Sequence, residues 1–147
     1  MALTALMAGV FVYLGERSGS GVYFLPESWQ AIWSPSWIGL HLPGFLHTFA
    51  FSILTAVALV PSRSVVAASC VVWVFVNSLF EFGQVDTVAA EITRYTPAWL
   101  GNWPVLENLN SYLLAGTFDP VDVVFVVLGG AAAFFTMTAC SQAGDSK

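Results

Sequence analysis

Apolar and polar stretches alternate along this chain, and four apolar runs set its predicted elements. The second and fourth runs carry no formal charge over roughly the 20 residues that a helix needs to cross a hydrocarbon core. The third run ends in Glu81 and Gln84, which we place in the interfacial layer. The runs predict about four transmembrane helices, at residues 2–15, 42–60, 65–85 and 120–140.

The first run is short for a crossing. An apolar stretch of about 10 to 14 residues also fits the core of a signal peptide. No Lys or Arg precedes the run, however, and no A-x-A-like cleavage site stands before Glu16 and Arg17. We therefore expect a tilted helix or one that thins the membrane locally.

The connections between the runs differ in length. Residues 61–64, Pro-Ser-Arg-Ser, are the whole link between the second and third runs, which predicts a tight antiparallel hairpin. The two long connections predict short interfacial helices. In the later one, Leu106, Leu109 and Leu113 follow helical spacing beside polar neighbours, the pattern of a helix lying at the membrane surface.

Aromatic residues are concentrated in these long connections. Trp29, Trp33 and Trp37 recur every four residues, which on a helix would put the indoles in one stripe, although Pro35 interrupts that helix. The set also includes Tyr23, Trp99 and Trp103. Two interpretations fit: an aromatic belt at the lipid headgroups, or the wall of a ligand groove.

Composition agrees with a polytopic membrane protein. The chain is 57% hydrophobic and 9% charged, with a mean hydropathy of +0.76, whereas soluble domains are about 25% charged. The chain has four Lys and Arg against nine Asp and Glu, so it lacks the basic surface that a nucleic-acid-binding protein needs. We find no internal repeat or second domain, so residues 1–147 are predicted to form a single all-α transmembrane domain.

Orientation rests on few charges. Arg63 and Lys147 would lie on one side of the membrane and Arg17 and Arg94 on the other, so the positive-inside count is tied. A short turn that contains an Arg is a common cytoplasmic feature. We therefore expect both termini inside and a location in the cytoplasmic (inner) membrane.

Connectivity predicts where the polar residues within the apolar runs meet. In an antiparallel bundle, the start of the second helix, the end of the third and the start of the fourth lie at one membrane face. The candidate binding residues at these three places are His47, then Asn77, Glu81 and Gln84, then Asp119 and Asp122. An ionisable group within a membrane segment is costly unless it faces protein, water or a partner, and its default interpretation is functional.

Structural roles compete with this interpretation. Asp119 before Pro120 fits a helix N-cap, and Asp122 then meets the positive end of the helix dipole. His47 equally fits a core histidine, and Asn77 and Gln84 fit hydrogen-bonding neighbours of Glu81. The small residues 129–133 favour close helix packing, within the chain or against a partner.

The cluster supports two kinds of chemistry. Carboxylates with a histidine are ligands for a divalent cation, and they also serve as general acids and bases. The sequence contains no H-E-x-x-H, G-x-S-x-G, Walker or dinucleotide-binding motif. It therefore assigns no catalytic residue, metal or cofactor. Carboxylates that only form hydrogen bonds between helices would give the same sequence pattern.

These residues carry a family resemblance. His47, then Glu81-x-x-Gln84, then residues 116–122 (Gly-Thr-Phe-Asp-Pro-Val-Asp) followed by Leu128-Gly129, resemble the VanZ-like family of small bacterial membrane proteins, one of which is linked to teicoplanin resistance. The resemblance implies a four-helix membrane bundle with its polar residues near one surface. The chain departs from the family at Gly116, where an Arg is frequent, and in a longer spacer after Gln84.

These observations leave three hypotheses. The chain is a VanZ-like cell-envelope protein that binds an amphipathic, lipid-linked or glycopeptide ligand at the polar site. Alternatively, it is an enzyme, metal-assisted or not, that acts on such a lipid. The third hypothesis is a structural subunit of a larger membrane complex, joined through the small-residue face of the last helix.

Overall fold

A computed structural model describes residues 1–16, 26, 28–34, 36–103 and 108–145. Within them the regular elements are helical: α1 (Ala2–Glu16), α2 (Trp37–Ala58), α3 (Arg63–Gly83), α4 (Asp86–Tyr95), the 3-10 helix η2 (Ala98–Asn102), α5 (Leu109–Ala115) and α6 (Pro120–Asp145). Four residues named in the sequence predictions lie outside these ranges: Arg17, Tyr23, Leu106 and Lys147. The all-α class is confirmed.

Three helices of the described chain are long and apolar enough to cross a membrane: α2, α3 and α6. They make the chain a multi-pass membrane protein by length and composition. Helix α1 is apolar but shorter, so a crossing by α1 stays a prediction.

Helix α2 begins at Trp37, five residues before the predicted start at residue 42. Ser36 caps the helix: its hydroxyl oxygen accepts a hydrogen bond from Gly39 N at 2.9 Å. The same hydroxyl donates to Glu16 Oε1 at 2.9 Å, which joins the end of α1 to the start of α2. Pro43 lies inside the helix, in its second turn.

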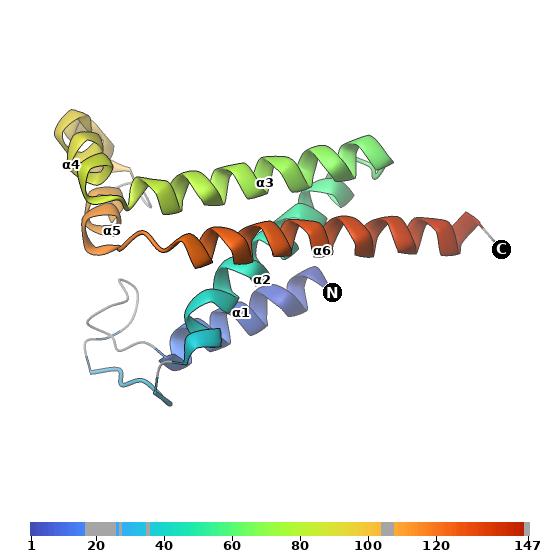
Figure 1. Cartoon of the computed structure of the whole chain (residues 1–147), viewed down its shortest axis with the longest axis horizontal. Helices are drawn as coiled ribbons and strands as arrows, with labels where there is room; N and C mark the ends of the chain where they lie inside the picture. Colours follow the sequence, from blue (N-terminus) through green and yellow to red (C-terminus); the bar gives the residue numbers. More distant parts are fainter. Residues whose placement is uncertain (17–25, 27, 35, 104–107, 146–147) are drawn as a thin grey trace.

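Helix α2 is the centre of the bundle. It packs against α1, α3 and α6, and α6 also packs along α3 (Figure 1). The start of α1 and the end of α6 point toward one side of the molecule, and α4 and α5 lie across the opposite end, where α3 finishes and α6 begins (Figure 1). The ends of α1 and α3 and the starts of α2 and α6 therefore share one end of the bundle.

Small residues bring the central helices close together. A methyl group on Gly129 of α6 would overlap the carbonyl oxygen of Phe45 in α2, and one on Gly130 would overlap Val74 of α3. Ala133 is fully buried in the same interface. The face predicted for helix packing is thus occupied within the chain by α2 and α3.

The outward faces of the long helices are apolar. The exposed large side chains include Leu54 and Val57 in α2, Val71, Phe75 and Leu79 in α3, and Val124, Val127 and Phe135 in α6. In water such a surface would aggregate, whereas in a bilayer it faces lipid tails of matching polarity. The burial pattern therefore agrees with the membrane assignment.

The predicted hairpin forms between α2 and α3. Val60 adopts a positive φ of 64°, and Ser62 caps α3 by accepting a hydrogen bond from Val65 N at 3.2 Å. A β-branched residue is rarely found in the left-handed region, so the turn is strained at Val60. This strain reflects a link too short for a relaxed reversal.

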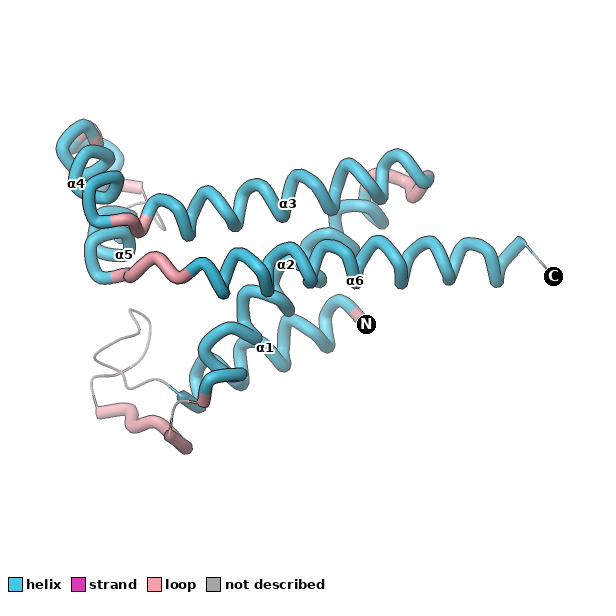
Figure 2. The backbone as a smooth tube through the Cα atoms, in the orientation of Figure 1, coloured by secondary structure: helices cyan, strands magenta, loops and turns pink. Residues whose placement is uncertain are grey.

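The long connections differ from each other. The later one contains the helices α4, η2 and α5 (Figure 2), which confirms that this connection forms short helices. Their position at the membrane interface stays a prediction. Residues 28–34 of the first connection contain no helix, so the short helix predicted for this connection does not form there, and Trp29, Trp33 and Trp37 do not share one helical stripe. The Trp29 indole instead donates to Leu14 O at 3.1 Å, and Trp33 N donates to Gly15 O at 3.2 Å.

These bonds give the two tryptophans a structural role. They pair carbonyl groups that the last turn of α1 leaves without helical partners. The Trp33 ring also covers Gly15 so closely that a side chain there would overlap it. In the described chain, Trp29 and Trp33 therefore cap α1.

Candidate functional site

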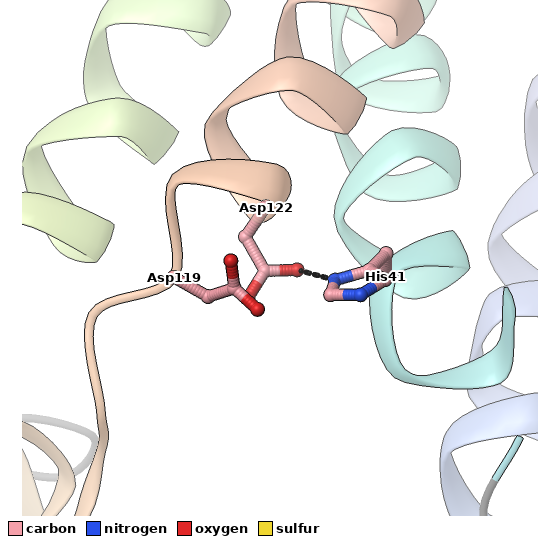
Figure 3. Close-up of side chains that lie close together, drawn as sticks. All are labelled: His41, Asp119 and Asp122. Atoms are coloured by element: carbon pink, nitrogen blue, oxygen red, sulfur yellow. Dashed lines mark hydrogen bonds and ion pairs between the residues drawn. The ribbon is translucent and has the colours of Figure 1, made fainter. Parts of the chain in front are cut away.

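A histidine and an aspartate form the centre of the site. His41, in the second turn of α2, and Asp122, in the first turn of α6, are joined by a contact of 2.7 Å between Nδ1 and Oδ1 (Figure 3). Their side chains are 5% and 26% exposed, so the pair is largely shielded from solvent. A hydrogen bond between residues 81 positions apart fixes how α2 and α6 meet at this end of the bundle.

Asp119 is the third member. It precedes α6, and its Oδ1 accepts a hydrogen bond from Val121 N at 2.8 Å, which confirms the predicted N-cap. One ligand atom each from His41, Asp119 and Asp122 lies within 4.8 Å of the others. A carboxylate has two oxygens with several lone pairs, so capping leaves Asp119 able to bind another group.

Aromatic rings hold His41 in place. The imidazole lies 5.1 Å from the Trp37 ring and 5.4 Å from the Phe125 ring, measured between centroids, and Trp37 and Phe125 also contact each other edge to face. The imidazole thus packs against one ring from its own helix and one from α6. This packing restricts rotation and directs Nδ1 at the carboxylates (Figure 3).

Glu81 belongs to the same end of the bundle. Its carboxylate is close enough to interact electrostatically with Asp122, Asp119 and His41. The third and fourth predicted crossings therefore bring their acidic residues together, as connectivity predicted. Within the described chain, the ion pairs are His41 with Asp122 and the exposed Arg94 with Glu91, so no described Lys or Arg pairs with these carboxylates.

The remaining predicted residues have other roles. Asn77 donates from Nδ2 to Thr48 Oγ1 at 3.1 Å and to Trp73 O at 2.9 Å, which links α3 to α2. Gln84 is buried and donates to Tyr112 Oη at 2.9 Å, which links the end of α3 to α5. Both side chains thus hold the helices that surround the site.

His47 does not join the site. It is exposed on α2 and stacks on Phe51, with ring centroids 4.4 Å apart. His41 and His47 are six residues apart, which on a helix turns them to different faces, so only one can point at α6. Placing the start of α2 at residue 42 excluded His41 from the sequence prediction.

The sequence did hold a signal for His41. Ser36 followed by an apolar stretch is typical of a helix start, and it would have placed His41 one turn into α2, level with the start of α6. Glu16 was also missed as a buried group. It is 7% exposed, and its Oε2 has no hydrogen-bond partner among the described residues.

An apolar groove lies beside the polar cluster. It has a volume of about 330 Å³ between α3 and α6 and is lined by Phe75, Ser78, Leu79, Phe82, Phe118 and Val123. Phe118 precedes Asp119 in the chain and Val123 follows Asp122. The groove lining therefore includes the chain neighbours of both aspartates.

Comparison with known proteins adds no relative. No protein-family model, curated protein or solved structure matches this chain. A proposal for its function therefore depends on the geometry of the site.

Proposed function

We propose that this chain is a VanZ-like bacterial membrane protein that binds an amphipathic ligand, either a lipid-linked precursor or a lipophilic glycopeptide. The polar head of the ligand binds at His41, Asp119 and Asp122. Its apolar tail lies in the groove between α3 and α6. The proposal includes a location in the cytoplasmic membrane, with both termini inside.

One observation carries the proposal: Phe118 and Val123, the chain neighbours of the two aspartates in the polar cluster, line the apolar groove. Amphipathic ligands need apolar surface and a few fixed polar groups side by side. The groove walls supply the apolar surface, and Asp119 and Asp122 supply acceptors for hydroxyl, amide or ammonium groups. A cluster that only locked helices together would not require a groove beside it.

Binding in nanodiscs tests the polar half of the site. The probes are a fluorescent lipid-linked disaccharide and a fluorescent lipoglycopeptide, and the readout is anisotropy. Asp122→Asn should weaken binding of one probe at least tenfold, because charge-assisted hydrogen bonds are about twice as strong as neutral ones. Glu91→Gln is the control, since Glu91 is an exposed carboxylate on α4. Equal affinity of both variants for both probes would contradict the proposal.

A second pair of variants tests the apolar half. Ser78→Trp fills the groove and should reduce affinity for a long-tailed probe more than for a short-tailed one. Val71→Trp is the matched control, because Val71 is exposed two helical turns earlier on the same face of α3. If the two tryptophan variants bind alike, the groove does not hold the tail.

An enzyme acting on such a lipid is the second candidate. The observation that favours it is the contact of 2.7 Å between His41 and Asp122, since a carboxylate that orients an imidazole is a common general-base arrangement. Purified protein that releases a product from the lipid-linked probe, with turnover abolished in His41→Gln and retained in His47→Gln, would establish it. Binding without turnover would leave the first proposal standing.

A further inference from the structure

We infer that His41, Asp119 and Asp122 form a binding site for a divalent transition-metal ion, with Glu81 as an additional carboxylate near it. The inference deepens the proposed function and rests on the same site. It adds a metal ion to the residues that would meet the polar head of the ligand.

The spacing of the ligand atoms suits a metal. With bonds of about 2.1 Å, ligands of one ion lie about 3.0 Å apart when adjacent and about 4.2 Å apart when opposite in an octahedral site. The Nδ1 to Oδ1 distance of 2.7 Å is near the first value, and the limit of 4.8 Å for the three atoms is near the second. A metal ion that binds Nδ1 would take the place of the proton in this hydrogen bond, and the proton would move to Nε2 or to solvent. Rotation of the partly exposed Asp119 side chain closes the difference.

The donor set selects the class of metal. One imidazole nitrogen with carboxylate oxygens suits Zn²⁺ or Mn²⁺ better than it suits Ca²⁺ or Mg²⁺, which prefer oxygen ligands alone. Thiolates are absent from the cluster that the structure describes, which disfavours soft ions.

Charge gives an independent reason. Glu81 interacts electrostatically with Asp119, Asp122 and His41. Among the described residues, His41 is the only potentially positive partner identified for these carboxylates. Of the basic residues that the structure describes, Arg63 begins α3 at the opposite end and Arg94 pairs with Glu91. Grouped carboxylates repel one another in a poorly solvated place, and a bound cation removes that repulsion.

The protein also fixes the ligands before any metal arrives. His41 is 4% exposed and packed against Trp37 and Phe125. Asp119 is held by its cap bond, and Asp122 by the first turn of α6. Metal sites need this kind of rigidity, and two long helices supply it here.

The test is metal binding to the purified full chain in detergent. The protein is stripped with chelator and titrated separately with ZnCl₂, MnCl₂, MgCl₂ and CaCl₂ by isothermal titration calorimetry. Equilibrium dialysis with elemental analysis gives the stoichiometry. We expect one ion per chain, and at least a tenfold loss of affinity in His41→Gln and in Asp119→Asn.

Two controls match these variants. His47→Gln removes the other histidine of α2, and Glu91→Gln removes an exposed carboxylate; both should bind as the parent does. Asp119→Asn can still cap α6, because Asn is as good an N-cap as Asp, so its loss of binding would not reflect misfolding. Thermal unfolding without metal checks that His41→Gln remains folded.

The outcomes separate the inference from the proposed function. Three results would each overturn the metal inference: no stoichiometric metal binding, equal losses of metal affinity in the His41 and His47 variants, or tighter binding of Mg²⁺ or Ca²⁺ than of Zn²⁺ and Mn²⁺. Probe binding in chelator would then decide the proposed function alone. Metal binding without any probe binding would sustain the inference and reject the proposed ligand.

Discussion

Gly129→Ala is the substitution that most directly perturbs how α2 and α6 carry the site. A methyl group at Gly129 would overlap Phe45 O and would lie 3.1 Å from Phe45 C and 3.2 Å from Phe45 Cα, so the obstacle is backbone and cannot rotate away. The helices must separate. Overpacking of this kind costs about 1 to 3 kcal/mol.

The same interface offers a matched control. A methyl group at Gly44 of α2 would lie 3.6 Å from Val126 Cγ2 of α6, an ordinary contact. Both substitutions gain about 0.5 to 1 kcal/mol of helix propensity, so this gain cancels when the two variants are compared. Gly129→Ala should therefore be about 1 to 3 kcal/mol less stable than Gly44→Ala.

Unfolding of the detergent-solubilised protein, followed by circular dichroism during titration with dodecyl sulfate, measures this difference. Gly129 lies two helical turns after Asp122 on the same face of α6, so separation of the helices should also weaken probe binding. Equal stability of the two variants would show that α2 and α6 do not cross closely at Gly129, and the reasoning would fail.

Two further predictions concern the ends of α2. Gly39→Ala places a methyl group against the Glu16 carboxylate and should lower stability by about 1.5 to 3 kcal/mol, because it breaks the hydrogen bond between Glu16 and the Ser36 cap of α2. Gly9→Ala is the control: its methyl group would lie 3.4 Å from Leu46 Cβ, so the loss of stability should be smaller. Equal thermal stabilities of the two variants would contradict this prediction. Val60→Gly should raise stability by about 1 kcal/mol because glycine adopts a positive φ without strain, and Val57→Gly in the helix should lower it. A melting temperature of the Val60 variant at or below that of the parent would count against the strained turn.

The fold was largely predictable because its signals are local. The apolar runs located three long helices, and Pro61-Ser62 located the hairpin, since lipid requires a continuous helix wherever the chain crosses it. The α2 start was placed late because the apolar run was counted from Leu42, the residue after His41. The structure makes Trp37 the first residue of α2 instead.

The site was predictable only in part. The order of the helices alone predicted that one end of the bundle would hold Asp119, Asp122 and Glu81. The choice between His41 and His47 depends on which face of α2 meets α6, and that is set by the Gly129 crossing against Phe45. The helix start at Ser36 would have admitted His41 as a candidate, but a contact between helices far apart in the chain selects it over His47.

A double-mutant cycle on His41→Gln and Asp122→Asn tests the central claim, that α2 and α6 meet through this pair. The free energy of unfolding of the parent, both single variants and the double variant gives their coupling. A contact of 2.7 Å between an imidazole and a carboxylate predicts a coupling of about 1 to 3 kcal/mol, while the same cycle with His47 should be additive. Additivity within about 0.5 kcal/mol for His41 and Asp122 would contradict the site.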